Sequence, residues 1–91
     1  MSTRYDWDLD KAEANFRKHG VTFEEAAVML DGDRCEERPD IGHSLGDVRV
    51  RTIGYTPMEK VIVVITSTSG PRPRIITARR ATKRERHEYV G

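Results

Sequence analysis

The apolar residues of the first part of the chain recur at the spacing of a helix. Asp8 is a favourable N-cap, and Leu9, Ala12 and Phe16 follow it as one apolar stripe. Gly20 comes directly after this segment and two basic residues, at a position where a left-handed residue ends many helices. The pattern therefore predicts a helix that begins after Asp8 and ends before Gly20.

A second short helix is predicted directly after this turn. Thr22 and Glu25 have the spacing of a capping box, in which each side chain bonds the other residue's backbone N–H. The residues expected to face inward are Phe23, Ala26, Ala27 and Leu30, and Asp31-Gly32 is expected to end the helix. The first third of the chain thus predicts two helices joined by a tight turn.

From residue 33 onward the pattern changes to that of strands. Residues 60–66 contain the continuous β-branched apolar run Val61-Ile62-Val63-Val64-Ile65, which is typical of a central strand buried on both faces. Residues 54–59 and 67–71 contain glycine and proline and are predicted as the turns on either side of it. The next strand is expected to begin at residues 74–77.

Residues 47–53 alternate between polar and apolar side chains, as expected of a strand with one buried face. Val48 and Val50 share one face, but Ile53 joins them only if a bulge lies near Thr52. The pattern therefore predicts a strand with an irregularity at that point.

Two further elements complete the predicted fold. Residues 3–7 are a short, partly aromatic segment expected to form an opening strand, and Thr82 and Glu85 form a capping box for a last helix that ends near Tyr89. The expected order is strand, two helices, four antiparallel strands and a helix. This order indicates an α+β fold, with residues 1–91 as a single domain.

Composition excludes several classes of protein. No apolar run approaches the 18 residues of a membrane-spanning helix, and the N-terminus lacks the apolar region of a secretory signal. The one cysteine, Cys35, excludes an internal disulfide and fits a reducing cytoplasm. A chain of this length buries only about 60–65% of its unfolded surface, so we expect a shallow surface cleft as its site.

The formal net charge of +1 conceals a strong segregation of charge. Residues 71–91 hold seven basic and two acidic side chains, whereas residues 31–47 hold six acidic and two basic ones. A basic end on a nearly neutral protein favours a local anionic partner over general coating of nucleic acid. The acidic segment is either a face for a protein partner or a loop that masks the basic region.

The basic residues of this end lie where a strand leads into a helix. Arg72, Arg74, Arg79 and Arg80 precede the expected N-terminus at Thr82, and arginine forks together with free backbone N–H groups bind phosphate. Arginine stays protonated, so it stabilises negative charge on phosphorus rather than acting as a base. The alternative is that Arg79 and Arg80 form structural salt bridges with the acidic segment.

Other candidate residues have two interpretations each. Lys18 and His19 are either charges that stabilise a helix C-terminus or acid–base groups, for which the imidazole pKa of about 6.5 is suited. Trp7 is either a core residue or a platform for a base. His43, His87 and Cys35 lack the spacing of metal ligands, and phosphate-binding glycine motifs are absent, so neither a metal nor a nucleotide cofactor is expected.

Several blocks occur together in an order and spacing more specific than any one of them. They are Tyr5-Asp6-Trp7-Asp8, Lys11, Asn15, Lys18-His19-Gly20-Val21, Phe23-Glu24-Glu25-Ala26, Arg51, Gly54 and Ile75-Ile76-Thr77-Ala78-Arg79-Arg80-Ala81-Thr82-Lys83-Arg84-Glu85-Arg86. Over nearly the whole chain this arrangement resembles the BrnT family of type II toxins. The chain departs from relatives at Ser44-Leu45-Gly46-Asp47-Val48-Arg49, which leaves open whether Arg49 or Arg51 faces the cleft.

The resemblance implies a RelE-like fold, in which helices flank a small antiparallel sheet. It also implies a cytoplasmic, metal-independent ribonuclease that needs no cofactor and inhibits translation. The implied partner is a BrnA-like ribbon-helix-helix antitoxin, with two toxins on an antitoxin dimer that binds operator DNA. Two alternatives stay open, namely a decayed toxin that only binds its antitoxin and a nucleic-acid-binding module.

The resemblance also suggests roles for individual residues. Arg79 matches a basic residue associated with toxicity in the family. The residues expected to be catalytic are Arg79, His19, Lys18 and Arg80, and those expected to contact RNA are Trp7, Arg51, Arg74 and Lys83. The expected reaction is transesterification, in which the RNA 2′-oxygen attacks its own phosphate and leaves a 2′,3′-cyclic phosphate and a 5′-hydroxyl.

Overall fold

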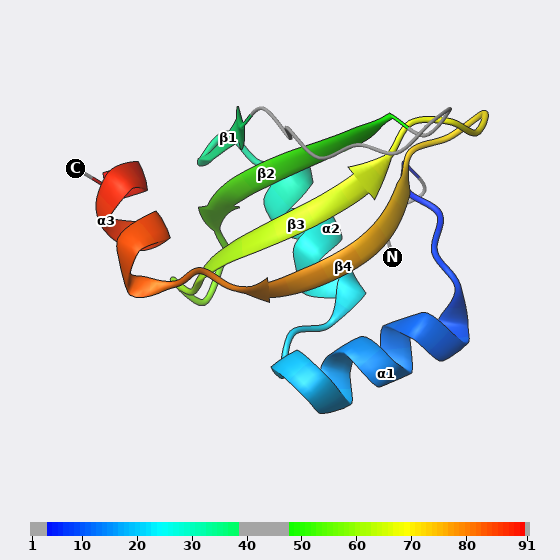
Figure 1. Ribbon diagram of the computed structural model, residues 1–91, viewed down its shortest axis with the longest axis horizontal. Coiled ribbons are helices and arrows are strands. Elements are labelled where there is room, and N and C mark those ends of the chain that lie inside the picture. Colours follow the sequence, from blue (N-terminus) through cyan, green and yellow to red (C-terminus); the bar gives the residue numbers. More distant parts are fainter. Residues whose placement is uncertain (1–3, 39–47, 91) are drawn as a thin grey trace.

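The computed structural model describes residues 4–38 and 48–90 of the chain. Its elements are, in order, α1 (Leu9–His19), α2 (Phe23–Asp31), β1 (Cys35–Arg38), β2 (Arg49–Tyr55), β3 (Val61–Ser67), β4 (Arg74–Arg80) and α3 (Lys83–Val90). The strands form one antiparallel sheet in the order β1-β2-β3-β4, so each strand pairs with the one before it (Figure 1). The α+β class is as predicted.

The helix ends follow the capping signals of the sequence. The Asp8 side chain accepts a hydrogen bond from the Lys11 backbone N–H, and Gly20 adopts the left-handed conformation (φ 71°) that ends α1. Both halves of the Thr22–Glu25 capping box are present at α2. Because these caps satisfy backbone groups that the helices leave unpaired, the chain turns sharply between α1 and α2.

The sheet contains one bulge, but it does not lie where the sequence pattern predicts it. β2 pairs with β3 without interruption from Arg49 to Tyr55, so the bulge predicted near Thr52 is wrong. The irregularity lies instead on β4, where Ile76 is the extra residue between the pairs Thr66–Ile75 and Ile65–Thr77. Ile53 therefore faces away from Val50, and the two sides of the sheet each bury apolar residues.

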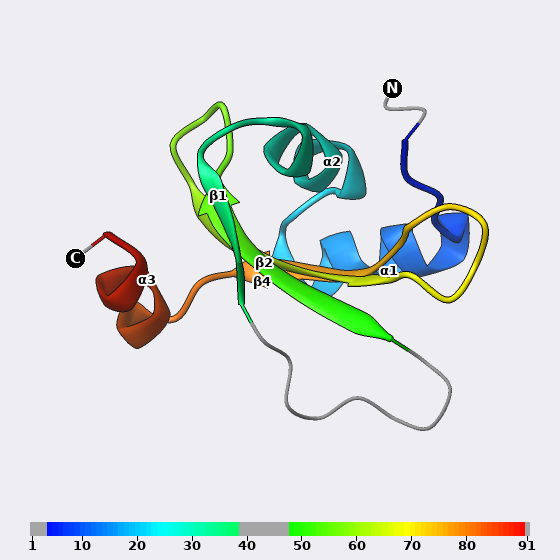
Figure 2. The same ribbon diagram turned by 90° about the horizontal axis from the view of Figure 1, so that it is seen from above.

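Residues directly opposite each other on paired antiparallel strands share a face, so the register defines two faces. The side packed against α2 is here called the helix face, and the other side the open face. Figure 2 shows α1 and α2 on one side of the sheet, with α3 at its end. α3 reaches the open face there, since Tyr89 and Ala81 pack against Ile53, Val61 and Val63.

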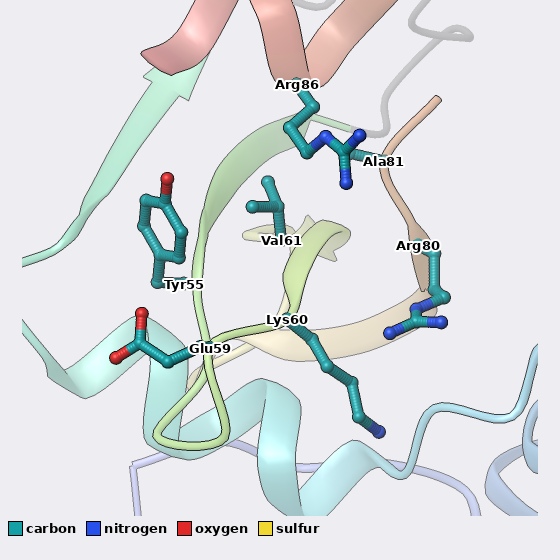
Figure 3. A pocket seen from close by; sticks show the side chains of 7 residues that line it. All are labelled: Tyr55, Glu59, Lys60, Val61, Arg80, Ala81 and Arg86. Atoms are coloured by element: carbon teal, nitrogen blue, oxygen red, sulfur yellow. The ribbon is translucent and has the colours of Figure 1, made fainter. Parts of the chain in front are cut away.

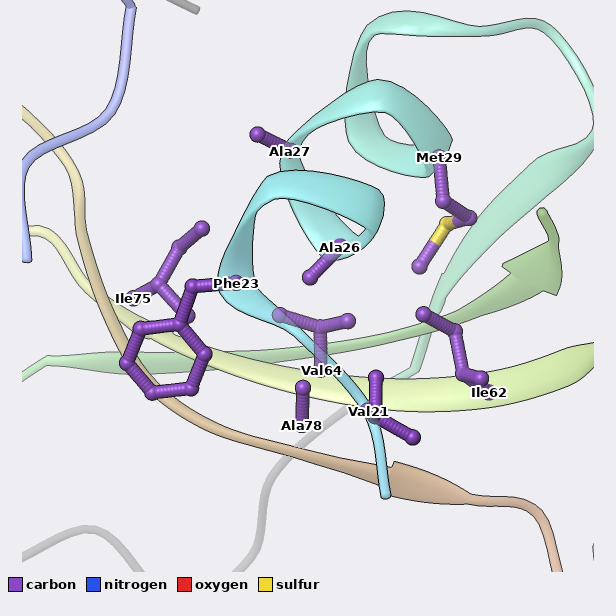
Figure 4. Packing of buried hydrophobic residues seen from close by; sticks show 9 residues of the cluster. All are labelled: Val21, Phe23, Ala26, Ala27, Met29, Ile62, Val64, Ile75 and Ala78. Carbon is purple, nitrogen blue, oxygen red and sulfur yellow. The ribbon is translucent and has the colours of Figure 1, made fainter. Parts of the chain in front are cut away.

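The main core lies between α2 and the helix face (Figure 4). It consists of Val21, Phe23, Ala26, Ala27, Met29, Ile62, Val64, Ile75 and Ala78, all at most 2% exposed. Of the residues predicted to face inward from α2, Leu30 is only partly buried, and Met29 takes the deeper position. β3 is the central strand that its continuous apolar run predicted.

The opening strand predicted over residues 3–7 is not found in residues 4–7, where a single bridge joins Asp6 to Arg74. Of the apolar stripe of α1, only Ala12 packs against the main core, because Leu9 and Phe16 are 78% and 51% exposed.

The buried contact of α1 is polar and lies at the edge of the sheet. The Asn15 side chain donates to the carbonyls of Ala78 (2.7 Å) and Val21 (3.0 Å) and accepts from the Ala78 N–H (3.1 Å). An amide that bonds both backbone groups of an edge residue takes the place of a neighbouring strand. α1 therefore lies along the β4 edge, which leaves Leu9 and Phe16 outside the core.

The helices in the described ranges are too short and too polar to cross a membrane.

Gly54, predicted to begin a turn, instead lies within β2 against β1. A Cβ atom on it would lie 2.6 Å from Cys35 Cβ and 2.7 Å from both the Arg34 carbonyl and the Met29 sulfur. Only glycine lets the two strands and α2 approach this closely.

Candidate functional site

Arginines gather on the open face of the sheet. By register this face carries Glu36 and Arg38 of β1, Arg49, Arg51, Ile53 and Tyr55 of β2, Val61, Val63, Ile65 and Ser67 of β3, and Arg74, Thr77 and Arg79 of β4. Its central strand offers only apolar side chains and one hydroxyl. The positive charges therefore flank a neutral floor formed by β3.

The register also gives the spacing of these charges. Arg49 and Arg74 lie in one row across the sheet, on either side of Ser67. Arg51 lies one row further along, and Arg79 belongs to the row of Val63. Since β2 and β4 are about 10 Å apart, arginine side chains from both strands can reach an anion above β3.

Arg79 is held in place by α3. Its guanidinium donates two hydrogen bonds to the Glu85 carboxylate, at 2.7 and 2.9 Å. The same carboxylate accepts from the Thr82 backbone N–H at 2.8 Å, and Thr82 caps the Glu85 N–H in return. The strand, the helix N-terminus and the guanidinium are thus joined through one carboxylate.

This arrangement has an electrostatic consequence. The hydrogen bonds from Arg79 lower the pKa of Glu85 from 4.5 to about 2, against the opposing effect of its partial burial. A carboxylate that holds its charge so firmly is a poor general base at neutral pH. Glu85 in turn raises the pKa of Arg79 through these hydrogen bonds, so Arg79 stays protonated within the pair.

The structure brings three of the expected site residues together. Arg51, Arg74 and Arg79 all belong to the open face, and because β2 has no bulge, Arg49 and Arg51 belong to the same face. Sequence reasoning missed Arg38, which lies opposite Arg51 and contacts Glu36 at 3.5 Å. Residues 35–38 of its strand show no clear alternation of polar and apolar side chains, so no pattern in the sequence indicates the face of Arg38.

Arg80 does not lie on the open face with Arg79. As the neighbour of Arg79 on a strand it points to the other side, and it pairs with Ile62 of the helix face. It lines a cavity of about 410 Å³ at the end of the sheet, together with Tyr55, Glu59, Lys60, Val61, Ala81 and Arg86 (Figure 3). The structure therefore separates the two adjacent arginines that the sequence grouped.

Lys18 and His19 are in the last turn of α1, the helix that packs against β4. Lys18 is exposed and His19 is half-buried. In the described part of the chain neither residue has a hydrogen bond or an ion pair with Arg79. Both residues thus flank the edge strand that carries Arg79 without belonging to the open face.

The remaining two candidates lie elsewhere. Trp7 packs against the main core, with its ring edge-on to Phe23 at 6.1 Å, a contact typical of a core residue. Lys83 is exposed on the first turn of α3. Neither of these two positions is part of the arginine rows.

The structure also bears on the alternatives left open by the sequence. Arg79 pairs with Glu85, which lies outside the acidic segment 31–47. Residues 39–47 of that segment, with His43 and Ser44-Leu45-Gly46-Asp47, lie outside the described residues. Across residues 4–38 and 48–90, no group of three His, Cys, Asp or Glu side chains is arranged to hold a metal ion.

Comparison with known proteins gives a family and a solved structure of similar fold. A family model described as "Ribonuclease toxin, BrnT, of type II toxin-antitoxin system" matches residues 7–85. The 1.1 Å crystal structure of the Brucella abortus ribonuclease toxin BrnT superposes with a TM-score of 0.66, covering 90% of this chain and 100% of that one at 24% identity. No protein with a curated description matches the chain. The matched structure shares the fold of this chain.

Proposed function

The chain belongs to the BrnT family of ribonuclease toxins of type II toxin–antitoxin systems, and from this premise we propose that it is an endoribonuclease that binds RNA on the open face of its sheet. The observation that carries the proposal is the position of Arg79 on the open face, where Glu85 holds its guanidinium and Arg51 of β2 lies across β3, one row away. Cleavage of messenger RNA would inhibit translation.

Arg79 is proposed to bind the phosphate that is cleaved. The 2′-oxygen attacks phosphorus, the bond to the 5′-oxygen breaks, and negative charge develops on the non-bridging oxygens. A preorganised guanidinium stabilises that charge without a metal ion, since it is already oriented before the substrate arrives. Arg51 and Arg74 would bind neighbouring phosphates, and Lys83 and Trp7 stay weaker candidates for RNA contact because they lie outside the arginine rows.

Proton transfer is proposed for His19 or Lys18, at the end of α1 beside the edge strand β4. One of them would take the 2′-hydroxyl proton, and a proton would pass to the departing 5′-oxygen. Loss of a general acid or base costs about 10²–10⁴-fold in rate. His19→Gln and Lys18→Gln variants should therefore identify the group, and a residue whose replacement leaves the rate unchanged has no such role.

The decisive experiment is a cleavage assay on a defined RNA with EDTA present. Arg79→Ala should abolish cleavage, whereas Arg17→Ala, an arginine of α1 remote from the open face, should leave it intact. Because Arg79→Ala also frees Glu85, the double variant Arg79→Ala/Glu85→Ala and thermal unfolding serve as controls for α3. Full activity of a folded Arg79→Ala variant would overturn the assignment, and loss of wild-type cleavage in EDTA would overturn metal independence.

A type II toxin has an antitoxin as its partner, and we propose a BrnA-like ribbon-helix-helix protein in a 2:2 complex that binds operator DNA. The apolar side chains of Leu9 and Phe16 on α1 support a protein partner, since they are largely exposed to solvent. Light scattering of the co-purified pair gives the stoichiometry. A chain that binds the antitoxin but cleaves no RNA and does not stop translation would instead be a decayed toxin.

A further inference from the structure

We infer that the cavity at the end of the sheet is a second phosphate subsite, which binds the RNA phosphate next to the one cleaved at Arg79. This inference rests on the proposed function for the identity of its ligand as RNA. The cavity is assigned by its size, its charge and its position relative to Arg79, each of which is an independent observation.

The cavity has the size of a ligand site and a mixed lining. Its volume of about 410 Å³ falls within the usual range for small-ligand pockets, about 300–1,000 Å³. Val61 and Ala81 form an apolar base, and Figure 3 shows Arg86 extended over them from α3 with Arg80 nearby at the end of β4. The cavity is therefore lined by two guanidinium groups, with that of Arg86 over the apolar base.

The acidic residues near the cavity are already neutralised. Glu59 forms a bidentate pair with Arg34, at 3.0 and 2.8 Å, and Figure 3 shows its carboxylate turned away from Arg80 and Arg86. Lys60 contacts Glu25 at 3.3 Å. In residues 4–38 and 48–90 no acidic side chain pairs with Arg80 or Arg86, so a phosphate is the ligand that matches their charge.

The cavity adjoins the row of Arg79. Val61 and Ala81 line it, and they are paired by a backbone hydrogen bond one row beyond Val63 and Arg79. Two residues along a strand span about 7 Å. An RNA chain with one phosphate at Arg79 therefore has its neighbouring phosphate beside the cavity, whereas Arg49 and Arg74 lie toward the other end of the face.

The test uses the full-length protein and RNA in which 2′-O-methyl groups prevent cleavage. Arg86→Gln removes one cavity charge, and Arg84→Gln makes the same change on the same helix at an exposed residue outside the cavity. Binding of a hexanucleotide is measured against salt concentration. Losing one phosphate contact should lower the slope of log K against log salt by about 0.7 for Arg86→Gln, with a smaller change for Arg84→Gln.

A length series separates this subsite from the site at Arg79. A dinucleotide has a single internucleotide phosphate, so Arg86→Gln should leave its binding unchanged but weaken binding of a trinucleotide about tenfold. Titration with inorganic phosphate, followed by the amide signals of Val61 and Ala81, shows whether free phosphate also binds. Equal effects of the Arg84 and Arg86 variants, or no effect of Arg86→Gln at any length, would overturn the subsite.

The two proposals can fail separately. If Arg79→Ala retains cleavage while Arg86→Gln weakens the trinucleotide, the catalytic assignment fails and the subsite stands. If Arg79→Ala abolishes cleavage and Arg86→Gln has no effect on binding, the subsite fails alone. Since binding is measured with uncleavable RNA, a chain without ribonuclease activity still tests the cavity.

Discussion

The two faces of one four-stranded sheet have opposite chemistry. The helix face is covered by α2 and carries the main core, in which Ile62 and Val64 are completely buried. The open face has charged residues at both edges and is covered only at one end, by α3. Because side chains alternate along each strand, β3 contributes Ile62 and Val64 to the main core on one side and the half-buried Ile65 to the uncovered part of the open face on the other.

The largest expected effect comes from a matched pair of substitutions in β3. Ile62 is fully buried on the helix face, whereas Ile65 is half-buried on the open face. Ile62→Ala should lower the free energy of unfolding by about 2–5 kcal/mol, and Ile65→Ala by less than half of that, because an exposed site leaves no closed cavity. Urea denaturation measures both, and equal losses would show that the open face is covered.

Substitution of Gly54 tests the close packing of β2 against β1 and α2. A Cβ there would meet backbone and side-chain atoms at 2.6–2.7 Å, so Gly54→Ala should cost about 1–3 kcal/mol as β1 and α2 are pushed apart. Gly70→Ala is the matched control, since the nearest atom to its added Cβ would be 3.7 Å away. Thermal unfolding of both variants checks this, and a Gly54→Ala protein as stable as the control would contradict the described packing.

Asn15 tests how α1 is attached to the sheet edge. Asn15→Leu should destabilise the protein by about 1–3 kcal/mol, because the buried N–H and C=O of Ala78 lose their partner. Hydrogen exchange should show faster exchange of the Ala78 amide than in wild type. An unchanged exchange rate at Ala78 would mean that α1 is held by other contacts.

The sequence predicted those parts of the fold that depend on local chemistry. Capping at Asp8, Thr22 and Thr82 gave the helix starts, and the β-branched run gave the central strand. The prediction failed where contacts between residues distant in sequence determine the packing. The position of α1 is one case, because it is set by hydrogen bonds from Asn15 to Ala78, 63 residues away. An apolar stripe predicts which side of a helix packs only when the helix lies on a core.

The candidate site was predictable in composition but not in arrangement. Arg79 could be singled out, yet its separation from Arg80 follows from the alternation of β4, and its union with Arg51 follows from the register across three strands. The residue that pairs with Arg79 is Glu85, which the sequence identifies only as a member of the capping box with Thr82. A second role for Glu85 appears only when β4 and α3 are placed together, since six residues separate it from Arg79.

The smallest expected effect concerns pH and the anchoring of α3 to the open face. Glu85 has a pKa of about 2 in the folded chain and an ordinary value of 4.5, so its pairing with Arg79 stabilises the fold above about pH 4.5 and is lost as the pH falls toward 2. The pair is partly exposed, which limits the contribution to about 0.5–1 kcal/mol. Unfolding measured between pH 5 and 2 should therefore show a pH-dependent loss in wild type that is smaller in Glu85→Gln. Glu88→Gln, at an exposed residue of the same helix, should keep the wild-type dependence. If Glu85→Gln keeps it as well, general acid unfolding rather than the anchor of Arg79 is responsible.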